Sequence, residues 1–169
     1  ASYKKEAFVE ISRLAALRGD WSEALARIDD ALALGQDEAK LWTLKGVFLR
    51  KLGKEQDAVR CFTRAIVCDP LEYWAVVERD GVAEAEKNRG IKAQQLLETV
   101  CDYFGIGAWE EIVALCDFAL AKAAREEPYA TEGALPLKET LAACDSYKSP
   151  MFAYFRAYAQ EMLNPKGVV

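Results

Sequence analysis

The feature that most constrains the fold is an internal repeat, because residues 5–38 align with residues 39–72 at an offset of 34 positions. Several positions hold the same small residue in both copies. Positions with a large apolar residue in one copy hold a different apolar residue in the other. The coinciding small pairs are Gly19 and Gly53, Ala24 and Ala58, and Ala31 and Ala65. This pattern is expected of two copies of one packing unit, in which size matters at close contacts and apolarity elsewhere.

Each copy predicts two helices. In the second copy, apolar residues recur at helical spacing before Gly53 and again after it. Gly53 lies where the end of a helix needs left-handed backbone, which costs glycine little. Asp20 is expected to cap the helix after Gly19, and Asp69 a helix with Pro70 at its first position. Because strand signals are missing, the fold class is predicted to be all-α.

The second copy resembles a tetratricopeptide repeat, a helix–turn–helix unit, at eight positions. Counted from Ala39, these are Trp42, Gly46, Leu49, Gly53, Ala58, Phe62, Ala65 and Pro70. The first copy is similar at Phe8, Ser12, Ala15, Gly19, Ala24, Ile28 and Ala31. Two residues differ from the family pattern. Lys45 stands where that family usually has leucine, and Gln36 of the first copy stands where it usually has proline. The resemblance implies a right-handed superhelical array of antiparallel helix pairs, with Ala24 and Ala58 where helices cross and Gly46 at a close approach.

The chain is predicted to be a single array over residues 1–169. Its repeats are expected at about 5–38, 39–72, 93–126 and, in part, 150–169, and its spacers at 73–92 and 127–149. The first spacer should hold a helix from Leu71 to a turn at Asn88–Gly90, and the second a short helix at Leu137–Cys144. Ser149 and Pro150 should begin a last helix, Met151–Leu163. Because the second helix of that unit is missing, the chain is expected to be a piece of a longer protein.

Composition excludes several functions. The net charge of −5 argues against nucleic-acid binding, and no apolar run approaches the roughly 18 residues of a membrane span. The absence of histidine removes the common catalytic pairs and histidine-ligated metals. Five scattered cysteines do not form a disulfide framework or a zinc motif, which predicts a cytoplasmic protein with buried thiols.

No catalytic constellation emerges from the remaining polar residues. Glu110 and Glu111 are adjacent, so their side chains point about 100° apart on a helix and do not share a substrate. The segment Gly105–Gly107 lacks the third glycine and the preceding strand of a phosphate loop. The chain is therefore expected not to be an enzyme and to need neither a cofactor nor a metal.

The family resemblance implies a peptide-binding groove formed by the first helix of each unit. The expected groove residues are Glu6, Val9, Arg13, Ala16, Leu17, Lys40, Thr43, Val47, Arg50, Lys51, Gln94, Leu97, Cys101, Phe104 and Gly105. In the first two units these comprise four cations and one anion, a sum of +3, which favours a partner with acidic and apolar residues. Equally, these charges could simply be a solvated face. In that family, chaperone-binding members carry a carboxylate clamp of lysine and asparagine in the first unit. Here the corresponding residues are Val9 and Arg13, and Thr43 and Val47 in the second unit, so that mode is not expected.

Two alternatives stay open. Exposed apolar residues on the last helix would favour a homodimer through Met151, Phe152 and Phe155. Segments at 69–74, 103–111 and after Pro150 also resemble bacterial proteins in which an irregular array of such repeats follows a mutarotase-like domain. That resemblance implies an accessory segment packed against a domain of the same polypeptide, for instance a carbohydrate-active one. The first expectation remains a non-catalytic scaffold for protein or peptide partners.

Overall fold

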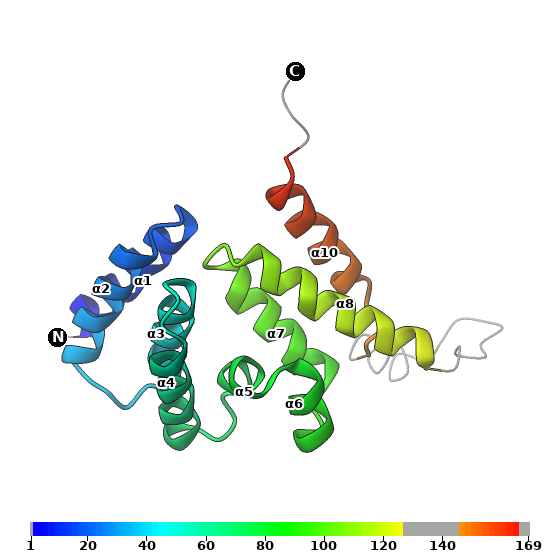
Figure 1. Ribbon diagram of the computed structural model, residues 1–169, viewed down its shortest axis with the longest axis horizontal. Helices are drawn as coiled ribbons and strands as arrows, with labels where there is room; N and C mark the ends of the chain where they lie inside the picture. Colours follow the sequence, from blue (N-terminus) through cyan, green and yellow to red (C-terminus); the bar gives the residue numbers. More distant parts are fainter. Residues whose placement is uncertain (1, 127–145, 166–169) are drawn as a thin grey trace. The chain divides into compact units, whose positions relative to one another are not determined.

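The computed structural model describes residues 2–126 and 146–165, and every regular element in these ranges is an α-helix (Figure 1). The prediction of an all-α fold is thus confirmed for this part of the chain. None of the described helices combines the length and apolarity needed to cross a lipid bilayer. The helices are α1 (Ser2–Leu17), α2 (Trp21–Ala33), α3 (Ala39–Lys51), α4 (Glu55–Cys68), α5 (Tyr73–Asp80), α6 (Val82–Arg89), α7 (Ala93–Phe104), α8 (Trp109–Arg125) and α10 (Pro150–Leu163).

The chain divides into two compact units. The first comprises Ala1–Ala85 with Gly105–Gly107, and the second Glu86–Phe104 with Ala108–Val169. The boundary after Ala85 falls inside α6, within the expected spacer at 73–92.

In the first unit, α1 packs against α2 and α3 against α4, each pair joined by a short turn (Figure 1). Gly19 and Gly53 make these turns with φ of 75° and 77°, as the repeat predicts. Asp20 caps α2 by accepting a hydrogen bond of 3.1 Å from the Glu23 amide. The α2 helix also packs against α3, and α5 packs against α4 and α3. The two predicted hairpins are therefore present.

Small residues lie at the helix crossings, as predicted. Ala24 and Ala58 have no exposed surface. A Cβ atom on Gly46 would lie only 2.4–2.9 Å from ring atoms of Phe62 on α4. Since real Cβ contacts are longer than 3.0 Å, only glycine allows α3 and α4 to approach this closely here.

The predicted helix after Asp69 is wrong in two respects. The Asp69 side chain accepts a hydrogen bond from the Leu71 amide (2.9 Å), which closes a turn, and α5 begins only at Tyr73. The helix also ends at Asp80, because Gly81 has a φ of 83°, and α6 starts afresh at Val82. The turn expected at Asn88–Gly90 does occur, with Gly90 at φ 61°.

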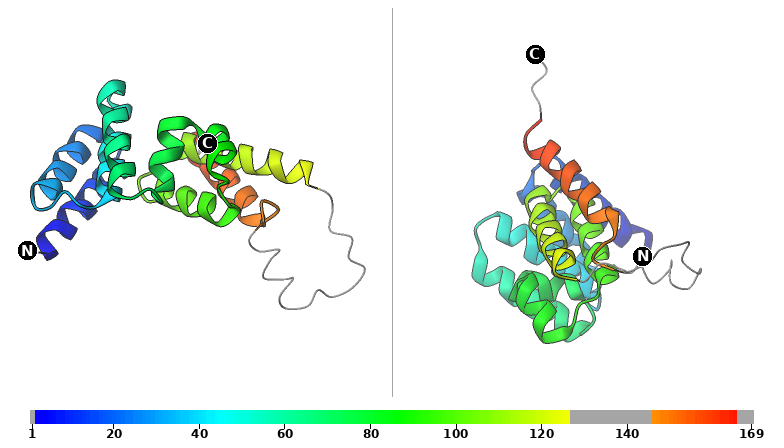
Figure 2. Two further views of the ribbon diagram at one scale, coloured as in Figure 1. Left: turned by 90° about the horizontal axis from the view of Figure 1, so that it is seen from below. Right: turned by 90° about the vertical axis from the view of Figure 1, so that its right-hand side faces the viewer.

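In the second unit, α7 packs against α8. The turn that links these two helices along the chain contains Gly107, whose φ is 68°. Figure 2 shows α10 beside α8, and α10 also contacts α7. The predicted start of the last helix is confirmed, since the Ser149 hydroxyl caps α10 by accepting from the Met151 amide. Phe152 on α10 is fully buried. The short helix expected at Leu137–Cys144 lies outside the described residues.

Candidate functional site

A pocket of about 240 Å³ lies between α1 and the start of α3, within the first unit. It is called the α1–α3 pocket below. Four of the expected groove residues line it, and its full lining is Lys5, Glu6, Val9, Glu10, Arg13, Glu38, Lys40 and Leu41.

Helical spacing explains why these side chains converge. On α1 the lining residues recur at intervals of three and four positions, so they form one face of the helix. The opposite wall is the start of α3, which contributes Lys40 and Leu41 from its first turn and Glu38 from its N-cap. Leu41 is buried and Val9 is half-buried, which makes an apolar floor between charged walls.

The charges around the α1–α3 pocket balance. Three acidic and three basic side chains line it. Lys5 forms an ion pair of 2.5 Å with Glu38, and Arg13 one of 2.5 Å with Glu10. The charge of +3 was summed over the expected groove residues alone. Lys5, Glu10 and Glu38 also line the pocket, but they are not groove positions in the family pattern and were not counted. The local field is therefore much weaker than the sequence count implies.

The structure places other expected groove residues inside the protein. Thr43 has no exposed surface, Val47 is 1% exposed and Ala16 is 2% exposed. The Thr43 hydroxyl donates to the Ala39 carbonyl at 3.1 Å, which satisfies its hydrogen-bonding capacity within α3. These side chains support the core, whereas Leu17 is 49% exposed at the end of α1.

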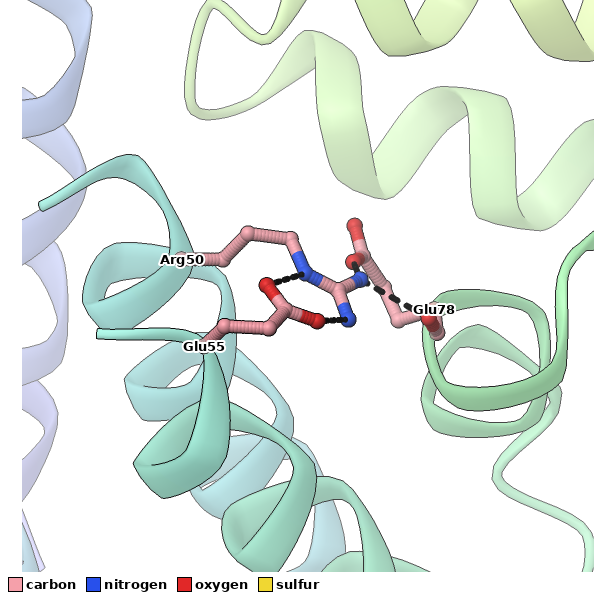
Figure 3. Close-up of polar contacts among 3 residues, drawn as sticks. All are labelled: Arg50, Glu55 and Glu78. Atoms are coloured by element: carbon pink, nitrogen blue, oxygen red, sulfur yellow. Dashed lines mark hydrogen bonds and ion pairs between the residues drawn. The ribbon is translucent and has the colours of Figure 1, made fainter. Parts of the chain in front are cut away.

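Arg50, another expected groove cation, is held by two carboxylates (Figure 3). Its Nε and Nη2 donate to the two carboxylate oxygens of Glu55 at 3.0 and 2.6 Å. Its Nη1 donates to the Glu78 carbonyl at 2.7 Å and pairs with the Glu78 carboxylate. The guanidinium also lies 4.9 Å from the centre of the Phe62 ring. Its charge is thus compensated within the fold.

The contact between Arg50 and Glu55 changes the pKa of the Glu55 carboxyl group. The hydrogen bond from Arg50 holds the pKa of the Glu55 carboxyl below its ordinary value, because the bond favours the ionised form. Lys51, the neighbouring groove cation, lies with its Nζ 5.5 Å from the centre of the Trp21 ring. Arg50 and Lys51 therefore both interact with side chains of the protein itself.

Four of the expected groove residues of the third repeat lie on α7, in the second unit, and Gly105 lies in the turn that follows α7. Gln94 and Cys101 are exposed, and Leu97 is half-buried. Partial burial raises the pKa of the Cys101 thiol, with Asp102 and Glu98 adding to the effect. Phe104 contacts the rings of Trp109, Phe155 and Tyr158, with centroids 5.2–5.7 Å apart. Phe104 is therefore part of an aromatic cluster rather than a free wall of a groove.

The residues expected at a dimer contact on α10 have different environments. Met151 is 41% exposed, whereas Phe152 has no exposed surface and Phe155 packs against Phe104. The large apolar side chains exposed on this helix are Met151, Tyr154, Tyr158, Met162 and Leu163.

Sequence reasoning missed the acids that face the groove cations. Glu10 is three positions from Arg13, and this spacing was a usable signal for a pair on one helix face. Glu78 had no such signal, because it reaches Arg50 from 28 positions away through the packing of α5. Lys45, which departs from the family pattern, forms an ion pair of 2.7 Å with Asp29 on α2.

The adjacent acids Glu110 and Glu111 and the cysteines are the remaining side chains that were considered for catalysis or metal binding. Glu110 and Glu111 lie in the first turn of α8, where the helix dipole favours acids. Among the described residues, no group of three or more cysteine, aspartate or glutamate side chains is placed to hold a metal ion. Cys61 and Cys116 are buried, and burial raises the pKa of Cys116 to about 12.

Comparison with known proteins adds no identity to this arrangement. Neither the family models searched nor the curated proteins contain a match to the chain.

Proposed function

We propose that this chain is a tetratricopeptide-like array of helix pairs with a right-handed superhelical arrangement, and that it acts as a non-catalytic scaffold for a protein partner. A segment of that partner would bind at the α1–α3 pocket. The observation that supports this most is the convergence of Glu6, Val9, Arg13 and Lys40, all expected groove residues, on one pocket.

The size of the pocket favours a side chain over a metabolite. Its volume of about 240 Å³ is below the roughly 300–1,000 Å³ of sites that enclose small molecules. Val9 and Leu41 offer an apolar floor for one inserted residue. The partner segment should therefore be an extended or helical peptide with an apolar residue, flanked by an acidic one that lies close to Lys40.

A cytoplasmic location is part of the proposal. It rests on the scattered cysteines, of which the four in the described part of the chain are free thiols.

The test is a peptide-display selection against the 169-residue chain, followed by affinity measurements on Val9→Glu and Lys40→Glu. Both changes should weaken the selected peptides about tenfold or more, because they alter the floor and the wall of the pocket. Val67→Glu is the matched control, since Val67 is 70% exposed on α4 and does not line the pocket. Peptides that bind all three variants as well as the unmodified chain would contradict the proposal.

The alternative function is packing against another domain of the same polypeptide or against a second copy. The exposed residues Met151, Tyr154 and Tyr158 on α10 favour it, because exposed apolar patches commonly mark contact surfaces.

A further inference from the structure

The α1–α3 pocket has a counterpart one repeat further along the first unit. At the offset of 34 residues, α3 and α5 correspond to α1 and α3. The helix starts keep this register, since α3 begins at Ala39 and α5 at Tyr73, with Glu38 and Glu72 as their N-caps. The region between α3 and α5 can therefore be compared with the pocket residue by residue.

The second residue of the later helix differs between the two copies. It is Lys40 on α3, where it lines the α1–α3 pocket, and Trp74 on α5. Trp74 is 2% exposed, and α5 packs against α3. The centre of its ring lies 5.9 Å from Nζ of Lys40. A large aromatic side chain is thus buried at the counterpart of the position that Lys40 holds beside the pocket.

The wall formed by the earlier helix differs in the same sense. Val9 and Arg13 on α1 line the pocket and are half-buried. Their counterparts on α3 are Thr43 and Val47, which are 0% and 1% exposed. This wall is therefore buried in the copy that has a tryptophan on the later helix, and it is accessible in the copy that has a lysine there.

We infer that the residue which the partner inserts into the α1–α3 pocket is aromatic, and that it takes there the place that Trp74 takes beside α3. This inference rests on the proposed function and narrows it. The partner is a peptide anchored by a tryptophan, phenylalanine or tyrosine side chain, rather than by an aliphatic one.

The lining of the pocket suits an aromatic ring electrostatically. Equal numbers of acidic and basic side chains surround the apolar floor of Val9 and Leu41, so an inserted charge would be repelled by one set. An aromatic ring is neutral, with an electronegative face and an electropositive edge. Its face attracts the cations Lys5, Arg13 and Lys40, its edge attracts the carboxylates, and its carbon atoms cover the floor.

The first unit already pairs cations with aromatic rings in this way. The guanidinium of Arg50 lies 4.9 Å from the centre of the Phe62 ring, and Nζ of Lys51 lies 5.5 Å from that of Trp21. An aliphatic side chain of the partner would cover the floor equally well, but it has no π face for the cations. The measurable consequence is a preference for an aromatic side chain over an aliphatic one of similar size.

Two small probes that differ in aromaticity test this preference. They are N-acetyl-phenylalaninamide and N-acetyl-cyclohexylalaninamide, each titrated into the 169-residue chain and followed by NMR. The phenylalanine compound should shift the amide signals of Val9 and Leu41 with a Kd of about 1–10 mM, and the cyclohexylalanine compound should bind about threefold or more weakly. Val9→Glu should remove the response, whereas Val67→Glu, at an exposed site on α4, should leave it unchanged. Equal or tighter binding of the cyclohexylalanine compound, or no saturable binding of the phenylalanine compound, would overturn the inference.

Two substitutions at position 40 test the comparison with Trp74. Lys40→Trp gives α3 the residue that α5 carries, so its indole should fill the pocket and remove the response to N-acetyl-phenylalaninamide. Lys40→Met has a side chain of similar length that leaves the pocket accessible, so it should weaken binding about threefold at most. Circular dichroism checks that each variant is folded. Binding to Lys40→Trp as strong as to the unmodified chain would overturn the inference.

Peptides selected by display separate this inference from the proposed function. Each should carry an aromatic residue whose replacement by leucine weakens binding about fivefold or more. Peptides that lose binding to Val9→Glu yet tolerate this replacement would overturn the inference and leave the proposed function standing. Peptides that bind Val9→Glu and Lys40→Glu as well as the unmodified chain would contradict the proposed function itself.

Discussion

At the scale of single residues, packing in the two hairpins is set by matched pairs. Gly46 faces the Phe62 ring, and the equivalent positions in the first copy hold Ser12 and Ile28. All four are buried, and the Ser12 hydroxyl donates to the Val9 carbonyl at 2.6 Å, so its burial is not penalised. The spacing of the repeat predicted a close approach at Gly46. It did not identify Phe62 as the neighbour, because that contact depends on how the helices are rotated.

Gly46→Ala is expected to destabilise the fold by about 1–3 kcal/mol, since the added methyl group would collide with the Phe62 ring. In an exposed helix interior the same change raises the free energy of unfolding by up to about 1 kcal/mol. The sign of the change therefore shows whether position 46 is crowded. Urea unfolding measures the effect, with Thr63→Ala at an exposed position of α4 as a control. Adding Phe62→Leu should recover part of the loss. A more stable Gly46→Ala variant would contradict the close approach.

Tyr147 predicts an effect of alkaline pH on stability. Its hydroxyl donates to the Ile91 carbonyl at 2.6 Å, and burial raises the pKa of Tyr147 to about 12. The folded state therefore keeps Tyr147 neutral where the unfolded chain ionises it, above about pH 10. The free energy of unfolding should fall between pH 10 and pH 12 by roughly 2–3 kcal/mol from this group.

The variant Tyr147→Phe separates this contribution from that of other tyrosines. Its free energy of unfolding should be about 1–3 kcal/mol lower at neutral pH, because the Ile91 carbonyl lacks its donor. Above pH 10, the free energy of unfolding of the variant should fall less steeply than that of the unmodified chain. Urea unfolding at several pH values measures both effects. An unchanged alkaline decline would show that Tyr147 ionises normally.

At the scale of elements, helix boundaries followed local chemistry wherever that chemistry was unambiguous. The glycine turns after α1, α3 and α7 and the caps at Asp20 and Ser149 were predictable. The start of α5 was not, because Asp69 and Pro70 suit either a helix start or the tight turn that forms. The position of α5 depends on Arg50, which links α3 to the first turn of α4 and to Glu78 on α5.

Arg50→Gln is expected to cost about 1–3 kcal/mol, because it removes the ion pair that Arg50 forms with the Glu78 carboxylate, whose side chain is only 5% exposed. Glu55→Gln should cost no more than about 1 kcal/mol, since Glu55 is 61% exposed. Hydrogen exchange should show the loss of protection in α5 for Arg50→Gln. Equal costs for the two variants would contradict the unequal roles of the carboxylates.

The same cluster predicts an effect of acid. The pKa of Glu55 is lower in the folded state, so its contribution is present above the ordinary glutamate pKa and is lost as the pH falls through the folded value. Glu55→Gln should therefore show a shallower loss of stability in acid than the unmodified chain, as measured by urea unfolding. An identical acid profile would exclude this linkage.

At the scale of the whole molecule, composition is a poor guide to any one surface. The chain has a net charge of −5, yet the α1–α3 pocket is lined by equal numbers of acids and bases. Of the groove residues that the family resemblance implies, Glu6, Val9 and Arg13 lie together on the α1 wall of the pocket. Thr43 and Val47, implied for the same groove, are buried, because the pattern gives positions along a helix and not the burial of each side chain.

Self-association is expected to depend on α10. Sedimentation equilibrium should show weak, concentration-dependent dimers that Met151→Lys combined with Tyr154→Lys abolishes, since both side chains are exposed. Leu71→Lys is the matched control, because Leu71 is 68% exposed outside α10. A single monomeric species at all concentrations up to about 1 mM would contradict a dimer.

The matched pairs in the hairpins have a consequence for protein engineering. A chimera that joins α1 to a copy of α4 would place Ser12 against phenylalanine, and the reverse exchange would leave Gly46 beside isoleucine with unfilled space. Each hairpin is thus the smallest interchangeable module, and shuffled libraries built from this chain should cut at the loops between hairpins rather than at the glycine turns within them.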